Sequence, residues 1–261
     1  MNTDLGPVGD VAEALASDIE GVLHDDLVGL YVYGSAVSGG FDPGVSDLDL
    51  VAVTAREVEA LDLPSLERMQ HAFVGRYPEW SNRLEIVYIG RATLQSFRTS
   101  SGSLAVVSPG ETFHVRRDRP ADWLQNWYLV RETGASLRGV EAASIIPPIA
   151  WPEFAAGTIR YADELGKRSR LAASGGTFAY TILTMCRALR TVRTQTLGSK
   201  QESAAWVRQL MPHWDWVIDE ALLCRMARGK MGFDEERMRA AADAFIGLLG
   251  DELHRKTPGR K

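Results

Sequence analysis

The sequence predicts an α+β protein in two parts: an N-terminal mixed sheet with flanking helices, followed by an all-helical bundle. In the first part, short apolar runs bounded by turn signals indicate strands at 27–33, 50–53 and 83–89. Segments with helical spacing of apolar residues lie between these runs. Beyond residue 151, apolar residues recur at helical spacing throughout. This change of pattern along one chain predicts the two parts.

The length of 261 residues suits one large domain or two moderate ones, each with its own core. We place the boundary near residues 139–151, where Leu-Arg-Gly-Val gives way to Ile-Ile-Pro-Pro. The chain is thus divided into a sheet domain, 1–145, and a helical domain, 146–261. A cleft between two such domains is the expected place for a ligand.

Composition and charge narrow the function classes. The chain is 45% hydrophobic and 24% charged, as ordinary soluble proteins are. Its net charge of −5 argues against a surface that tracks nucleic acid and is compatible with a cationic partner. No apolar run approaches the ~18 residues of a membrane span, and the first residues lack signal-peptide features, so we expect a cytoplasmic protein without a membrane partner. Cys186 and Cys224 lie in helical patterns and are expected to be buried, reduced thiols.

The predicted elements follow in order along the chain. Pro7 opens a helix at 7–23, which leads into a strand at about 29–33. The sequence Asp-Leu-Pro at 62–64 starts a second helix, and the stretch 77–81 ends it before the strand at 83–89. The Ser- and Gly-rich stretch 97–111 is expected to be a loop, either a flap over an active site or a surface excursion. His114 follows in a short strand with a structural role, and further helices are expected at 122–132, 152–171, 176–197, 201–211, 214–227 and 234–254.

The stretch 30–54 carries the candidate chemistry. Asp47 and Asp49 are two residues apart at the start of a strand, so their carboxylates point to the same side, repel each other and invite a cation. Upstream, Gly34 lets the backbone approach a ligand closely, and Ser35 offers a hydroxyl and an N–H to oxygen anions. Hard oxygen ligands beside phosphate donors suit Mg²⁺ carried on a nucleotide. Each part alone is more often a plain turn or a solvated acidic pair.

Together, these residues resemble the nucleotidyltransferase signature, in which Gly-Ser is followed, after a short connection, by Asp-x-Asp on the next strand. The segment YGSAVSGG…SDLDL is most similar to the aminoglycoside 3″/9 adenylyltransferases. This resemblance implies a polymerase-beta-like nucleotidyltransferase domain with ATP as co-substrate and Mg²⁺ as cofactor. It further implies that Asp47 and Asp49 hold the metal, and that Gly34, Ser35 and Ser46 contact the phosphates.

Glu85 lies in the otherwise apolar strand at 83–89, where a carboxylate needs a partner or a role. A salt bridge to Arg83, Arg91 or Arg98 is one interpretation. In the adenylyltransferases that the chain resembles, a Leu/Val-Glu-hydrophobic-hydrophobic segment supplies the general base, and Leu-Glu-Ile-Val at 84–87 matches it. The resemblance therefore implies Glu85 as the catalytic base, as a third metal ligand, or as both.

The second half carries a patchier resemblance. Gly-Ser-Lys at 198–200, followed by Ala-Trp and Leu-Met-Pro, matches a family segment whose Lys reaches the nucleotide phosphates, which implies that role for Lys200. Without the resemblance, a Lys at a helix start would be interpreted as solvated. Arg187 also matches a family Arg, although packing or an ion pair would explain it equally.

The implied reaction is transfer of AMP from ATP to a hydroxyl of an aminoglycoside-like, cationic small molecule, with release of pyrophosphate. Streptomycin-modifying members have a Trp and an Asp before the Arg-bearing helix, where an ungapped placement puts Ser174 and Thr177. We therefore expect spectinomycin to be preferred over streptomycin, while a non-antibiotic hydroxyl compound stays open. Other carboxylates that could meet a cationic substrate are Asp118, Asp122, Asp163 and Glu164.

Two alternatives belong to other classes. One is an antitoxin-like nucleotidyltransferase acting on a protein or RNA, with Arg208 and His213 as an Arg-x4-His ribonuclease motif. Pro212, directly before this His, favours coincidence because it is expected to end the helix. The other alternative is a nucleotide-binding regulator without turnover, and the complete set of three carboxylates argues against it.

Overall fold

The computed structural model describes residues 5–117, 119–169, 175–227 and 235–255. The chain divides into two compact units, Met1–Ala150 and Trp151–Lys261. The division lies a few residues beyond the predicted boundary at 145/146, because the main chain there is still bound to the first unit. Arg131 donates to the carbonyl of Ile146 (2.5 Å), and Arg98 donates to that of Pro148 (2.7 Å). Within the described ranges, no helix is long and apolar enough to cross a membrane.

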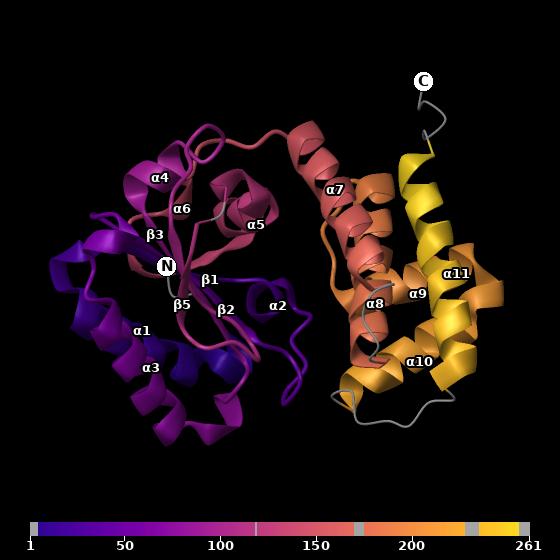
Figure 1. The fold of residues 1–261 in the computed structure, drawn as a ribbon, viewed down its shortest axis with the longest axis horizontal. Helices are drawn as coiled ribbons and strands as arrows, with labels where there is room; N and C mark the ends of the chain where they lie inside the picture. Colours follow the sequence, from indigo (N-terminus) through magenta and orange to yellow (C-terminus); the bar gives the residue numbers. More distant parts are fainter. Residues whose placement is uncertain (1–4, 118, 170–174, 228–234, 256–261) are drawn as a thin grey trace. The chain divides into compact units, whose positions relative to one another are not determined.

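The first unit is built on a mixed six-stranded sheet (Figure 1). The strands lie in the order β5-β4-β3-β2-β1-β6, and β2 and β3 run parallel while the other neighbours run antiparallel. The sheet thus places the end of β1 beside the starts of β2 and β3. The strands are β1 (Leu27–Tyr33), β2 (Leu48–Thr54), β3 (Leu84–Gly90), β4 (Leu104–Val107), β5 (His114–Arg116) and β6 (Ala135–Gly139).

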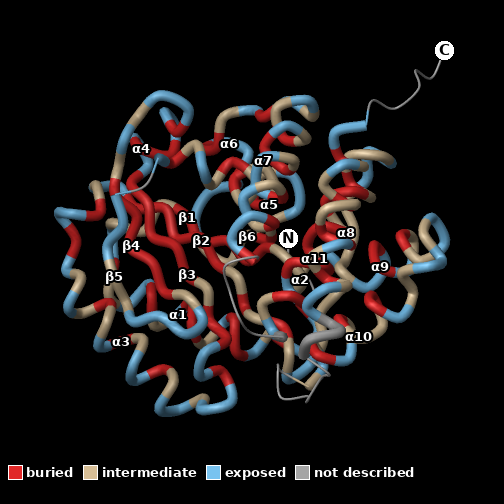
Figure 2. Tube along the Cα trace, turned by 45° about the vertical axis from the view of Figure 1, so that its right-hand side comes forward, coloured by how far each residue is buried: buried red, intermediate tan, exposed pale blue. Residues whose placement is uncertain are grey.

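The helices of this unit pack on both faces of the sheet (Figure 1). On one face, α1 (Gly9–Leu23) and α3 (Leu63–Arg76) cover alternate strand residues such as Leu30, Leu50 and Ile86, which join a single buried core. Figure 2 shows the central strands buried over most of their length. On the other face, α5 (Leu124–Thr133) contacts β1. The short helices are α2 (Ser35–Ser38), α4 (Arg91–Gln95) and α6 (Ala142–Ile145), with 3₁₀ turns at Gly6–Val8, His24–Asp26, Val58–Ala60, Pro78–Trp80 and Pro120–Trp123.

Several predicted elements are confirmed in the first unit. β1, β2 and β3 form where apolar runs predicted strands, and α1, α3 and α5 form where the helical patterns lay. Asp62 caps α3 by accepting from the N–H of Ser65 (3.1 Å), as the start signal at 62–64 predicted. His114 lies in the short strand β5, with its Nδ1 2.8 Å from the carbonyl oxygen of Thr112.

Two strands correct the sequence prediction. The stretch 97–111 is a loop only in part, because its four apolar residues Leu104–Val107 form β4, a fully buried strand paired with β3. The surrounding Ser and Gly residues masked this short run. β6 was not predicted, since it is an edge strand with polar positions. Its Arg138 forms ion pairs with Glu13 and with Glu20 of α1 (2.8 Å to Glu20), which fix this edge on the helix.

The second unit consists of helices in the part that the structure describes. They are α7 (Trp151–Ser169), α8 (Gly175–Thr194), α9 (Lys200–Leu210), α10 (Asp215–Met226) and α11 (Glu235–His254), with a 3₁₀ turn at Pro212–Trp214. α8 is central, because it contacts all four other helices and supplies much of the core. Cys186 and Cys224 are both buried, and burial raises the pKa of the Cys186 thiol above its usual range. These helices match the five predicted ones to within a few residues at each end.

Candidate active site

Three side chains form a row across three adjacent strands. Tyr33, the last residue of β1, lies directly opposite Asp49 of β2, and Asp49 lies directly opposite Glu85 of β3. Residues paired in this way point to the same face of a sheet. Their neighbours Leu48 and Leu84 are also paired, and both belong to the core on the α1 and α3 side. Asp49 and Glu85 therefore share the opposite face, which is the face that carries α5.

Asp47 directly precedes β2 and is half-buried, as are Asp49 and Glu85. The sequence predicted that Asp47 and Asp49 would point to one side, because they are two residues apart. The structure adds the register that places Glu85 beside Asp49. This register is a long-range feature, and only the motif resemblance could have anticipated it.

Gly34 lies against the Asp49 carboxylate. Its backbone has φ +72° and ψ −139°, a conformation that side-chain-bearing residues rarely adopt. A Cβ atom at Gly34 would overlap Oδ2 of Asp49 and would lie 3.2 Å from its Cγ. The glycine is thus required twice, by its own backbone and by the adjacent carboxylate. Ser35 follows as the first residue of α2 and is half-buried.

Ser46 belongs to a turn that closes on itself before β2. It is buried, its N–H donates to the carbonyl of Asp42 (2.9 Å), and its hydroxyl oxygen accepts from the N–H of Asp42 (2.9 Å). The Ser46 hydroxyl therefore stabilises the turn that precedes Asp47. Its predicted contact with phosphate stays a prediction.

Two residues near this row were not predicted to have a part in it. Asn126 of α5 donates to the hydroxyl of Tyr33 (2.7 Å), which ties the helix to the end of β1. Arg83, considered from the sequence only as an ion-pair partner of Glu85, is buried and donates to the carbonyl of Ser46 through Nε (3.0 Å) and Nη2 (2.5 Å). A sequence signal existed for Arg83, since a charged residue beside a buried strand needs a partner.

The donor set suits a magnesium ion that arrives with a nucleotide. Among the described residues, no group of three or more His, Cys, Asp or Glu side chains is arranged to hold a metal ion by itself. Mg²⁺ in phosphate-transferring sites commonly uses one or two carboxylates and takes its other ligands from substrate phosphates and water. Asp47 and Asp49 are two carboxylates of this kind, and their role as metal ligands stays a prediction. Glu85 as a metal ligand stays a prediction.

In the second unit, Lys200 is the first residue of α9, directly after Ser199, which forms a capping box with Glu202. The Lys200 ammonium lies 4.2 Å from the centroid of the Tyr180 ring, whose hydroxyl is 3.1 Å from that of Tyr161. Aromatic faces attract cations, so α9 presents this ammonium in a defined place. Its predicted contact with phosphate stays a prediction.

The remaining predicted residues, from both units, have local roles or lie outside the described residues. Arg187 and Thr177 are half-buried on α8, whereas Ser174 and Asp118 lie outside the described residues. Of the alternative anions, Asp122 is exposed. Asp163 is paired with His254 (2.9 Å) and Glu164 with Arg168 (3.7 Å).

The Arg-x4-His ribonuclease motif does not form one helical face. Arg208 lies on α9 and forms an ion pair with Asp219 of α10 (2.8 Å). His213 lies beyond the end of α9, in the 3₁₀ turn Pro212–Trp214. This placement agrees with the interpretation of the motif as coincidence.

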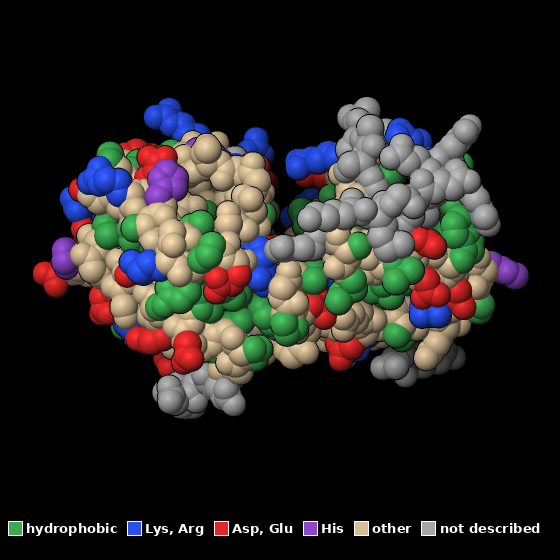
Figure 3. Space-filling view, turned by 90° about the horizontal axis from the view of Figure 1, so that it is seen from below, with side chains coloured by type: hydrophobic (Ala, Val, Ile, Leu, Met, Phe, Trp, Pro, Cys, Tyr) green, Lys and Arg blue, Asp and Glu red, His purple; other side chains and the backbone are tan. Residues whose placement is uncertain are grey.

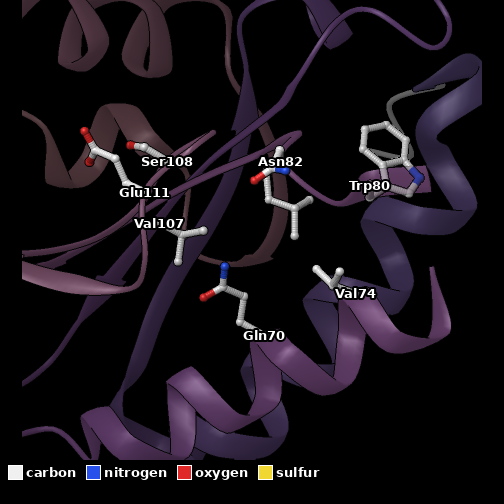
Figure 4. A pocket seen from close by; sticks show the side chains of 8 residues that line it. Gln70, Val74, Trp80, Asn82, Val107, Ser108 and Glu111 are labelled. Carbon is white, nitrogen blue, oxygen red and sulfur yellow. The ribbon is translucent and has the colours of Figure 1, made fainter. Parts of the chain in front are cut away.

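A small pocket lies behind the row, on the α3 side of the sheet (Figure 4). Gln70 of α3 points into it, and its lining also includes Leu84, Val107, Ser108 and Glu111. Its volume of about 30 Å³ has room for water but not for a nucleotide.

On the face seen in Figure 3, acidic and basic side chains are interspersed.

The fold, a mixed-sheet domain followed by a helical domain, is shared with the spectinomycin adenyltransferase AAD(9) from Enterococcus faecialis, whose crystal structure contains ATP and spectinomycin. The TM-score is 0.69 at 17% sequence identity, covering 93% of this chain and 99% of that chain.

Sequence comparisons give two further similarities. The family model of the aminoglycoside adenylyltransferase C-terminal domain matches residues 168–248. The spectinomycin 9-adenylyltransferase of Campylobacter jejuni is 23% identical over 202 residues, which cover 74% of this chain and 75% of that protein. The chain is thus similar to aminoglycoside adenylyltransferases in the sequence of its helical part and in its overall fold.

Proposed function

We propose that the protein is an adenylyltransferase that transfers AMP from ATP to a hydroxyl of an aminoglycoside-like small molecule, with spectinomycin preferred over streptomycin. The observation that carries this proposal is the paired register of Asp49 and Glu85, with Gly34 packed against the Asp49 carboxylate. ATP as co-substrate is supported by the related AAD(9) structure, which contains it.

Asp47 and Asp49 would hold Mg²⁺ together with the nucleotide phosphates. When bound, the ion supplies positive charge that offsets the charge developing on the phosphates. The proposal therefore includes a requirement of AMP transfer for Mg²⁺.

Glu85 acts as the general base. Its carboxylate takes the proton from the acceptor hydroxyl as that oxygen attacks the α-phosphorus. A bond forms between the acceptor oxygen and the α-phosphorus, the bond from the α-phosphorus to the bridging oxygen breaks, and pyrophosphate leaves with that oxygen. Because Glu85 is opposite Asp49 in the sheet, the base lies beside the residue that holds the metal and phosphates. Most of the rate enhancement then comes from positioning and charge neutralisation.

The phosphates would lie along the start of α2. Gly34 leaves the backbone open where a Cβ atom would stand, and Ser35 offers its hydroxyl and N–H at the first position of the helix. Lys200 is the further phosphate contact that the family resemblance implies, and Ser46 supports the turn that carries Asp47.

The acceptor preference follows from Ser174 and Thr177. An ungapped placement puts them where streptomycin-modifying members have a Trp and an Asp, and neither can stack on a guanidinium or pair with its charge. Spectinomycin is smaller and would lose less from their absence. The names of the relatives in Campylobacter jejuni and Enterococcus faecialis, both spectinomycin-modifying, support the same preference.

The preference is tested by measuring kcat/KM for spectinomycin, streptomycin and simple polyols through pyrophosphate release. We expect the value for spectinomycin to exceed that for streptomycin by at least about tenfold, which corresponds to about 1.4 kcal/mol. The double variant Ser174→Trp/Thr177→Asp should raise streptomycin turnover. Efficient adenylylation of streptomycin by the wild-type protein would contradict the assigned preference.

A further inference from the structure

Arg83 is a buried arginine at the start of β3, with 4% of its surface exposed. Its Nε and Nη2 both donate to the carbonyl oxygen of Ser46, and Nη1 donates to the carbonyl of Glu79 (3.4 Å). The guanidinium carbon lies 4.4 Å from the centroid of the Trp80 ring. Backbone carbonyls and an aromatic face thus fix the planar group from several directions.

These contacts join the two strands that carry the candidate carboxylates. Ser46 directly precedes Asp47, and Arg83 stands two residues before Glu85. The main chain repeats the connection, because the N–H of Leu48 donates to the carbonyl of Arg83 (2.8 Å). Arg83 therefore binds the start of β2 through its side chain and through its backbone.

Several internal hydrogen bonds hold together the turn that Arg83 contacts. The N–H groups of Val45 and Ser46 both donate to the carbonyl of Asp42 (3.1 and 2.9 Å), and the Ser46 hydroxyl closes the turn from the other side. The position of the Ser46 carbonyl therefore fixes the peptide group that joins Ser46 to Asp47. On the other side of Arg83, Asn82 has φ +57°, which sets a tight turn before β3.

Burying a charge is costly, and an apolar side chain of similar size is often the more stable choice in a protein interior. What the guanidinium adds is a rigid fork of donors that holds one carbonyl in one place. We propose that Arg83 is a positioning residue, which fixes the Ser46 carbonyl and thereby sets the place of the Asp47 carboxylate relative to Glu85. This proposal rests on the proposed function for the roles of Asp47 and Glu85.

The test compares Arg83→Met and Arg83→Lys with a matched control. Arg131 has the same chemistry elsewhere in the first unit, because its guanidinium donates to the carbonyls of Ala143 (2.6 Å) and Ile146 (2.5 Å). Arg131→Met therefore removes an equivalent set of bonds without touching the turn before β2. All measurements are made well below the unfolding midpoint of each variant.

The first readout is amide hydrogen exchange, which needs no activity. In Arg83→Met we expect the amides of Val45, Ser46 and Leu48 to exchange at least about tenfold faster than in the wild type, since the turn opens locally. Arg131→Met should leave these three rates unchanged. If Arg83→Met does not fold, Arg83→Lys carries the test, because it keeps the charge but loses the fork. Unchanged exchange at all three amides in the folded Arg83 variants overturns the proposal.

The second readout is catalytic. At saturating ATP, we expect Arg83→Lys to lower kcat about tenfold and Arg83→Met about 10²-fold, the scale expected for misplaced catalytic groups, and both to raise the Mg²⁺ concentration needed for half-maximal activity. Arg131→Met should change neither quantity. Wild-type kcat and Mg²⁺ dependence in Arg83→Met would contradict the positioning role. If the wild-type protein itself transfers AMP to no acceptor, the proposed function fails, and the exchange measurement still decides whether Arg83 fixes the turn.

Discussion

Replacing Gly34 by Ala tests the packing of Gly34 against the carboxylate of Asp49, the proposed metal ligand. The native backbone at Gly34 lies in a region where non-glycine residues cost about 1–3 kcal/mol. The new Cβ would also overlap Oδ2 of Asp49, and such overpacking costs about 1–3 kcal/mol more. We therefore expect Gly34→Ala to lower the free energy of unfolding by about 2–6 kcal/mol. Displacement of the Asp49 carboxylate should lower kcat by about 10²-fold.

Gly39→Ala is the matched control, because Gly39 also has a positive φ (+74°) but has nothing within 4 Å of the Cβ position. It should cost about 1 kcal/mol and leave kcat nearly unchanged. Urea unfolding of both variants is measured in the wild-type background and in an Asp49→Ala background. The difference between the two backgrounds gives the contribution of the overlap between the new Cβ and the Asp49 carboxylate. In the Asp49→Ala background the Cβ at position 49 would lie 3.6 Å from the new Cβ, an ordinary contact, so Gly34→Ala should cost only its backbone strain there. Equal losses for Gly34→Ala in both backgrounds would refute the reasoning.

Three further predictions follow from single side chains. Asp47→Asn and Asp49→Asn should each abolish AMP transfer. The double variant should lower kcat little further, because the effects of two groups that share one ion are not additive. Independent, mild losses in kcat would count against a shared metal ion. Glu85→Gln should leave binding of Mg·ATP nearly intact by calorimetry while kcat falls roughly 10²–10⁴-fold, whereas loss of nucleotide affinity would identify a metal ligand. Tyr88→Phe should raise the free energy of unfolding by about 1 kcal/mol, because the Tyr88 hydroxyl is buried without a hydrogen-bond partner among the described residues. A clear loss of stability in urea unfolding would show that this hydroxyl does form a hydrogen bond.

The local part of the fold could be predicted from the sequence. Period-two and helical patterns depend on neighbouring residues, so β1 to β3 and the helices of the second unit lay where these patterns placed them. β4 was missed because four apolar residues in a Ser- and Gly-rich stretch give too short a signal. β6 was missed because its stability comes from pairing with β1 and from the ion pairs of Arg138, both of which are long-range.

The same distinction applies to the candidate site. The spacing of Asp47 and Asp49 in one strand predicted that they point to one side. The contact of Asn126 with Tyr33 joins residues 93 positions apart, and the contact of Arg83 with Ser46 spans 37 positions. No local pattern encodes such pairs, so only the three-dimensional structure could identify them.

The most direct test of the account is the mass of the acceptor after incubation with the purified protein, ATP and Mg²⁺. With spectinomycin as acceptor, the account predicts a product heavier by one AMP unit, formed together with an equal amount of pyrophosphate. The product should be absent when Asp49→Asn replaces the wild-type protein. Unmodified spectinomycin after prolonged incubation with the wild-type protein, or equal product from Asp49→Asn, would contradict the account.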